Sequence, residues 1–427
     1  MVREAPAGLV ATTLGVSDAD FMSGKTRFSS LGGATGAVIN QGTLNAKDGG
    51  YIALLGTQVR NDGVITARLG TVALAAGNKV SLNFNGDSLV GVVVDEGALN
   101  ALVANGGAVR ADGGLVVLTA KGAEGLVHTL VNNTGEVRAQ TVENRAGRIY
   151  LLGENGAVEV AGSLDASAPG TGNGGFIETS ASRLHIADGT AITTRAASGA
   201  NGTWLIDPTD FTISAGSGAQ TSSGMGSSTL QTALGAGNVT IQTQAAGTEN
   251  GDINVNAPVA WSANKLTLEA HGDINVNAVV SASGSSTLDL KTGYNFNTGV
   301  PTFNTNKALN MGMNADRTFS GRIDINRTGT GLLAINNQGY TLINSVGAAG
   351  DELVASSAQT LQGMARAANL TGRYALASNI NASGTAGWNS GTGFVPIGVD
   401  DIYAPTSTAF SGALEGLGHT VTGLRVV

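Results

Sequence analysis

A seven-residue motif that returns at a fixed interval constrains this chain more than any other sequence feature. Asn40–Ala46 (NQGTLNA) recurs 21 residues later as Asn61–Ala67 (NDGVITA), and it returns as Asn105–Ala111 and Asn133–Ala139. Each copy is followed by a second short apolar segment: Gly50–Leu54, Gly70–Leu74, Gly114–Leu118 and Gly147–Leu151. A looser copy is Gly162–Ala166, followed by the segment Gly175–Thr179. Self-similarity at such an interval is the signature of a solenoid.

Within each copy the apolar residues alternate with polar or small ones, as Leu44 and Ala46 or Ile52 and Leu54 do. Alternation of this kind is typical of a strand with one face inward. The Asn and Gly residues at the turns suit backbone that reaches positive φ. One unit cannot bury its apolar face alone, whereas stacked units bury a continuous core.

A period near 20 with strands and no intervening helices favours an all-β, right-handed parallel β-helix over a leucine-rich repeat or a β-propeller. We expect Ile52, Leu54, Ile65, Val72 and Leu74 to share one core, and Lys47, Arg60 and Arg68 to face solvent. The motif Gly251–Ala257 (GDINVNA) recurs unchanged as Gly272–Ala278, again 21 residues on, so the solenoid is expected to continue there.

Composition agrees with a core built from small residues in many short strands. The chain has 64 Gly among 427 residues, and only 4% of its residues are aromatic. A net charge of −8 argues against nucleic acid as a partner, because phosphate binding needs a basic face. The absence of Cys excludes disulfides and thiol chemistry. No stretch of eighteen apolar residues is present, which argues against a membrane-spanning segment.

Two segments interrupt the repeat. The first, around Trp204 and Pro208, is followed by a Gly/Ser-rich stretch and an expected short helix at 228–234. In the second, 351–368, Leu353, Leu361 and Met364 have roughly helical spacing, which predicts a helix. A strand is expected over 374–380, followed by a polar loop that contains Trp388.

Three stretches resemble the filamentous-haemagglutinin-type exoproteins of bacterial two-partner secretion. Gly8–Leu14 with Ser17–Phe21 resembles the later part of the family's secretion domain, and Asn201–Pro208 (NGTWLIDP) resembles a recurrent junction in such adhesins. Gly393–Gly398, Phe410–Gly412 and Gly416–Val421 together resemble the GLUG repeat of surface adhesins.

The resemblance implies a secreted protein at the outer-membrane surface of a Gram-negative bacterium, with an outer-membrane transporter as one partner. The family's signal peptide and Asn-Pro-Asn motifs have no counterpart here, so we interpret the sequence as a fragment that lacks the first part of the secretion domain. We expect a secretion-domain remnant at 1–30, haemagglutinin-type repeats at 31–200, a junction at 201–235, a second β-helix stretch at 236–345, and a helix plus GLUG-like module at 346–427.

The function that this reading favours is a rod-like adhesin that binds a glycan or protein receptor on host cells, other bacteria or biofilm matrix. Trp204, Asp207, Asp210 and Trp388 are the candidate ligand contacts, while no catalytic residue, metal site or cofactor is expected. For Asp207 and Asp210 the favoured interpretation is that they cap turns around Pro208. Three alternatives stay open: a carbohydrate-active β-helix enzyme using these two carboxylates, the stalk of a contact-dependent toxin, and a haem-scavenging exoprotein.

Overall fold

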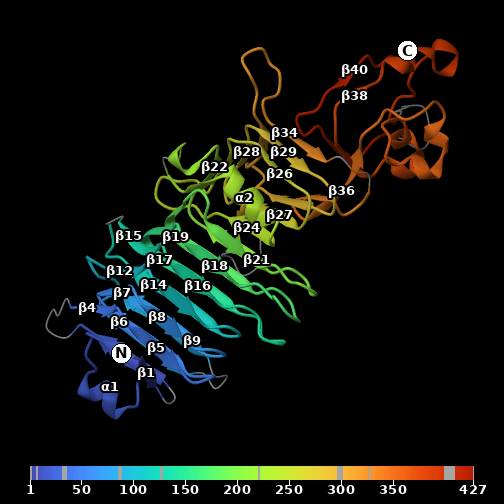
Figure 1. Ribbon diagram of the computed structural model, residues 1–427. Coiled ribbons are helices and arrows are strands. Elements are labelled where there is room, and N and C mark those ends of the chain that lie inside the picture. The colour runs from blue at the N-terminus through green and yellow to red at the C-terminus, as the bar shows by residue number, and fades with distance from the viewer. Residues whose placement is uncertain are drawn as a thin grey trace. The chain divides into compact units, whose positions relative to one another are not determined.

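The computed structural model describes residues 2–5, 8–30, 36–84, 89–125, 128–219, 222–295, 302–325, 327, 329–398 and 409–426. The chain divides into two compact units, Met1–Ile253 and Asn254–Val427. Parallel strands dominate both units. They are drawn as arrows in Figure 1, coloured from blue at the N-terminus to red at the C-terminus. The β-helix predicted from the repeats is confirmed.

In the first unit the strands form three faces, and the chain visits them in a repeating order. Face A contains β1 (Val2–Ala5), β5 (Thr43–Ala46), β8 (Val64–Thr66), β13 (Ala108–Arg110), β16 (Glu136–Arg138), β18 (Ser163–Asp165) and β20 (Ala191–Thr193). Face B contains β2 (Gly8–Thr12), β6 (Tyr51–Gly56), β9 (Thr71–Ala76), β14 (Leu115–Lys121), the first parts of β17 (Arg148–Val160) and β19 (Phe176–Ile186), β21 (Thr203–Asp207) and β24 (Asn238–Gln242).

Face C contains β4 (Ala37–Asn40), β7 (Gln58–Asn61), β12 (Leu102–Asn105), β15 (Thr129–Asn133), the second parts of β17 and β19, β22 (Phe211–Ser214) and β23 (Gly224–Gly226). The short 3₁₀ helix η2 (Ser217–Ala219) lies between β22 and β23. Helix α2 (Ser227–Leu234) confirms the short helix expected there. It takes the place in the chain that a face A strand takes in other coils, and it packs on β20.

The register brings repeat copies into direct alignment. Ile52 lies beside Val72, and Leu54 beside Leu74, on successive coils of face B. These four side chains and Ile65 are fully buried, whereas Lys47, Arg60 and Arg68 are exposed. The predicted division between core and surface is therefore confirmed.

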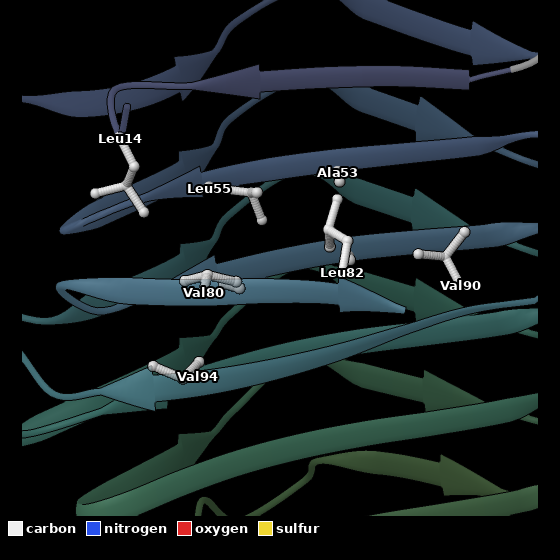
Figure 2. Close-up of a cluster of buried hydrophobic side chains, with 9 residues drawn as sticks. Leu14, Ala53, Leu55, Val80, Leu82, Val90 and Val94 are labelled. Atoms are coloured by element: carbon white, nitrogen blue, oxygen red, sulfur yellow. The ribbon is translucent and has the colours of Figure 1, made fainter. Parts of the chain in front are cut away.

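A three-stranded antiparallel sheet outside the coils was not predicted. It consists of β3 (Arg27–Ser29), β10 (Lys79–Phe84) and β11 (Val90–Glu96), and the short helix α1 (Asp18–Met22) precedes it in the chain. Its Val80, Leu82, Val90 and Val94 cover the outward residues of β6 and β9, which include Ala53 and Leu55 (Figure 2). This second layer explains why β6 and β9 are buried on both faces and read as continuous apolar runs.

The turn between faces C and A contains a ladder of buried asparagines. The side-chain amide of Asn40 donates to Asn61 Oδ1 at 2.8 Å, Asn61 donates to Asn105 at 2.8 Å, and Asn105 donates to Asn133 at 2.7 Å. The ladder spans sequence separations of 21, 44 and 28 residues, and the longest arises because β10 and β11 are inserted between Asn61 and Asn105. Each Asn side chain at this turn therefore forms a hydrogen bond with the equivalent Asn of the next coil.

At this turn the explanation by positive φ is wrong, although Gly49 and Gly113, at the turn that follows face A, do have positive φ of 77° and 68°. Among the described residues with positive φ, neither these four asparagines nor the glycines two positions after them are found. A Cβ on Gly63 would instead collide with the Gly42 carbonyl oxygen, and one on Gly107 would collide with that of Gly63. Glycine is required because stacked backbones approach too closely for a side chain.

The second unit repeats parallel pairing on a smaller scale. Its strands, after β25 (Ile253–Val255) at the boundary, are β26 (Val259–Trp261), β27 (Lys265–Glu269), β28 (Ile274–Val276), β29 (Val279–Ala282), β30 (Thr287–Lys291), β31 (Tyr294–Asn295), β32 (Thr302–Phe303), β33 (Leu309–Met311), β34 (Arg322–Ile325), β35 (Leu333–Ile335), β36 (Gln338–Ile343), β37 (Arg373–Leu376), β38 (Ile380–Asn381), β39 (Ala413–Glu415) and β40 (Val421–Thr422). β27, β30 and β35 pair in parallel, as do β26, β29 and β34. Asn310, Asn275 and Asn254 form a second amide ladder.

The helix predicted over 351–368 is wrong. The segment forms four 3₁₀ turns, η3 (Asp351–Leu353), η4 (Ala355–Ser357), η5 (Gln362–Ala365) and η6 (Ala367–Asn369). Leu361 and Met364 are buried but Leu353 is exposed, so the three do not share one helical face. The Ser357 hydroxyl donates to the Val354 carbonyl at 2.7 Å, which competes with a continuous helix.

The strand expected over 374–380 breaks after Leu376 and resumes at Ile380. Two further 3₁₀ turns, η7 (Ser383–Gly387) and η8 (Asn389–Gly391), flank Trp388. Across the described ranges no helix has both the length and the apolar character needed to span a membrane.

Adjacent glycines allow a matched test of coil stacking. Gly107→Ala forces a Cβ against the Gly63 carbonyl, whereas a Cβ at Gly106 meets Asp62 Oδ1 at an ordinary 3.6 Å. We expect Gly107→Ala to lower the free energy of unfolding by roughly 3 kcal/mol and Gly106→Ala to change it by less than about 0.5 kcal/mol. Denaturant titration measures both. Equal effects would contradict the close approach of the backbones.

Truncating the ladder tests the asparagines themselves. Asn61→Ala removes the acceptor of the Asn40 side-chain amide and the donor to Asn105 Oδ1. We expect a loss of about 2–4 kcal/mol in the free energy of unfolding. The exposed Asn100 serves as the control, since Asn100→Ala removes no ladder contact. A loss no larger than that of the control would mean that the ladder contributes nothing.

Candidate functional site

Proline ends one face B strand while the neighbouring strand continues. Ser180 of β19 lies beside Asp207 of β21, and β19 runs on through Ser182 to Ile186. β21 instead stops at Asp207, because Pro208 has no N–H to donate to the ladder. Thr209 then turns the chain and its hydroxyl donates to the Ser182 carbonyl at 2.8 Å. The different paths of the two coils open a hollow at this corner.

The hollow has a volume of about 330 Å³ and is lined by four segments from successive passes of the chain: 152–155, 180–182, 207–209 and 244–246. Asp207 and Glu154 are its acidic residues, and its lining, all of it described, includes no Lys or Arg. Glu154 forms an ion pair with Lys121 at 2.6 Å, whereas Asp207 faces an amide. The lining therefore carries negative charge, set among apolar residues such as Leu152, Pro208 and Ala246.

Asp207 is held in place by Gln244, whose side-chain N–H donates to Oδ1 at 3.2 Å and to Oδ2 at 3.1 Å. Burial raises the pKa of Asp207 to about 6, the Gln244 hydrogen bond opposes that rise, and the nearby charge of Glu178 adds to it. A carboxyl group with a raised pKa in a hollow is typical of functional sites.

The other predicted contacts have different surroundings. The Trp204 side chain is only 1% exposed and its ring N–H donates to Thr179 Oγ1 at 3.1 Å, so the prediction that Trp204 contacts a ligand is wrong. In the alternating strand β21 its position points into the core.

Asp210 is a turn-capping residue. Its Oδ1 accepts the backbone N–H groups of Gly251 and Asp252, both at 2.8 Å, and burial raises its pKa. It is not part of the hollow's lining, so Asp207 and Asp210 do not form a pair on one wall. The capping interpretation fits Asp210 but not Asp207, which accepts from a side chain.

Trp388, in the second unit, is half-buried and stacks on Phe394 with a centroid separation of 6.5 Å and an interplanar angle of 20°. It packs against a cluster that includes Met364 and Tyr374. Its contact with a ligand stays a prediction. Across the described residues no group of three or more His, Cys, Asp or Glu side chains is placed to hold a metal ion.

Sequence reasoning missed Glu154, Ser180 and Gln244. Aligning successive coils would have placed Ser180 next to Asp207, because the repeat register continues through β19 and β21. Gln244 could not be found in this way, since the insertion of β22, β23 and α2 separates it from Asp207 by 37 residues.

The raised pKa of Asp207 predicts a pH-dependent stability. The folded state binds the proton more tightly than the unfolded state, so stability falls as pH rises from about 4 through 6. We expect Asp207→Asn to stabilise the protein at pH 7 by about 1–3 kcal/mol, with the gain disappearing near pH 4. Asp48→Asn, at an exposed ion pair with Arg68, is the control and should change stability by less than about 1 kcal/mol. Urea titrations at pH 7 measure these changes. A destabilising effect of Asp207→Asn would contradict the claim that burial of the ionised Asp207 costs stability.

Comparison with known proteins identifies part of this chain. Halomucin of Haloquadratum walsbyi (strain DSM 16790 / HBSQ001) is 40% identical over 86 residues, which cover 19% of this chain and only 1% of halomucin. The HMW1 secretion domain from Haemophilus influenzae shares 16% identity at a TM-score of 0.44, with 78% of this chain and 75% of that chain covered. Residues 7–166 match the TPS secretion domain family. Residues 7–166 therefore belong to the TPS secretion domain family, which marks a protein exported across the outer membrane by a Gram-negative two-partner secretion system.

Proposed function

We propose that this exoprotein is an adhesin that acts at the bacterial surface and binds a glycan or protein receptor on host cells, other bacteria or biofilm matrix. The observation that carries the proposal is the continuation of the coils beyond the secretion domain. The pairing of face B passes without a break from β17 to β19, β21 and β24, although the match to the secretion domain ends at residue 166. A solenoid that extends past its export module supplies binding surface at little cost in new architecture.

The use of charged residues supports binding rather than catalysis. Arg110 pairs with Glu136 at 2.8 Å and Arg138 pairs with Asp112 at 2.8 Å, and each pair joins neighbouring coils. Asp210 caps a turn. These carboxylates therefore serve the scaffold and are not free to act on a substrate.

A carbohydrate-active enzyme is the second candidate, and the hollow is the observation that favours it. Asp207 has a raised pKa, as a general acid needs, and Glu154 lines the same hollow. Glycoside hydrolysis requires two carboxyl groups facing one bond. The ion pair of Glu154 with Lys121 favours binding over this reaction.

Binding of the purified chain to arrays of glycans and matrix proteins tests the adhesin. We expect saturable binding to at least one class of receptor and competition by the soluble receptor. The absence of binding across both arrays would contradict the proposal.

The enzyme is tested by incubating the chain with neutral and acidic polysaccharides. We expect no new reducing ends and no unsaturated products, because Asp207 lacks a free carboxylate partner. Turnover that disappears in both Asp207→Asn and Glu154→Gln would establish the enzyme instead.

A further inference from the structure

We propose that the hollow beside Asp207 is a binding site for a neutral hydroxyl-rich ligand, namely a hexose unit of a glycan. This inference rests on the proposed adhesin function and assigns a ligand class to one location on the coils. Three of the four lining segments, 180–182, 207–209 and 244–246, lie beyond the match to the secretion domain. The hollow is therefore built mainly by the part of the chain that follows the export module.

The size of the hollow suits a single sugar. Its volume of about 330 Å³ lies at the lower end of the range for small-molecule sites. Its lining includes small residues of β17 and β19, namely Gly153, Ala181 and Ser182, which leave the space open. Asp207 and Gln244, two of its larger polar residues, are hydrogen-bonded to each other.

The arrangement of Asp207 suits hydroxyl groups. Gln244 donates to both carboxylate oxygens and fixes the plane of the group, so little side-chain freedom is lost when a ligand binds. An ionised carboxylate can accept about four hydrogen bonds, and the Gln244 amide is the donor to both oxygens of Asp207. The remaining positions can accept two adjacent hydroxyls of a hexose in charge-assisted hydrogen bonds.

Charge selects among sugars. Asp207 and Glu154 line the hollow, and Glu178 of β19 adds negative charge close to Asp207. Glu154 has a basic partner, Lys121, whereas Asp207 accepts from the Gln244 amide. A uronic or sialic acid would bring a further negative charge into this wall and be repelled. The proposal therefore commits to neutral sugars.

The energetic state of Asp207 agrees with this role. Burial has removed part of the hydration of the carboxylate without providing a cation, and the pKa is raised as a consequence. Hydroxyl donors from a ligand would replace the missing water. A sugar that binds the ionised group must then lower the pKa of Asp207, which gives a readout that a purely structural residue would not show.

The experiment titrates the full chain at pH 7 with the methyl glycosides of glucose, galactose, mannose and N-acetylglucosamine, and with glucuronic and sialic acid. NMR follows the side-chain carboxyl carbons of Asp residues. We expect at least one neutral glycoside to shift the Asp207 signal and to lower its pKa, and the acidic sugars to bind at least tenfold more weakly. We expect Asp207→Asn to weaken the neutral sugar at least tenfold and Asp48→Asn to leave it unchanged.

Asp207→Asn keeps the shape of the side chain, and its thermal unfolding shows whether the fold is retained. Unchanged sugar affinity in a folded Asp207→Asn protein, equal binding of acidic sugars, or no response of Asp207 to any of the four neutral glycosides would overturn the proposal. If the chain still binds receptors on the arrays in these cases, the adhesin function stands and only the hollow is excluded. If Asp207 binds sugar but the chain binds no receptor on either array, the adhesin function fails instead.

Discussion

The close stacking of one backbone coil on the next is the constraint on which this structure depends. Parallel strands in neighbouring coils lie about 4.8 Å apart, so every residue must be compatible with the residue directly above it. At the turns between faces C and A this leaves no room for a Cβ, and Gly42, Gly63, Gly107 and Gly135 stack upon one another. Two residues before each of these glycines, the same stacking lets each buried Asn amide pair with the equivalent Asn of the next coil. The Asn and Gly residues recur in the sequence because each coil must meet this requirement.

The same constraint explains where a candidate site can arise. As long as every coil follows the one below, equivalent residues stack in ladders along the surface. Pro208 breaks the agreement between β19 and β21, and the hollow opens where the two paths separate. Gln244 of a later pass closes the site and orients Asp207. A local departure from the repeat thus produces a hollow that contains a buried carboxyl group with a raised pKa.

The sequence predicted the regular parts well because alternation and period report directly on stacking. Ile52, Leu54, Val72 and Leu74 could be assigned to the core from their spacing alone. The sheet of β10 and β11 could not be predicted, because its burial depends on a second layer that covers Ala53 and Leu55. Trp204 was misplaced since an aromatic beside two Asp residues suggests a sugar platform, while strand alternation sends it inward. Asp207 was found by its neighbourhood, but its partner Gln244 requires the tertiary fold.

A double-mutant cycle across the asparagine ladder tests the stacking most directly. Asn61 and Asn105 lie on adjacent coils and share a hydrogen bond of 2.8 Å, whereas Asn40 and Asn133 sit at opposite ends of the ladder. The account predicts a coupling free energy of about 1–2 kcal/mol between Asn61 and Asn105 and less than about 0.5 kcal/mol between Asn40 and Asn133. Equal coupling for the two pairs, or none between Asn61 and Asn105, would contradict a fold held together by contacts between successive coils.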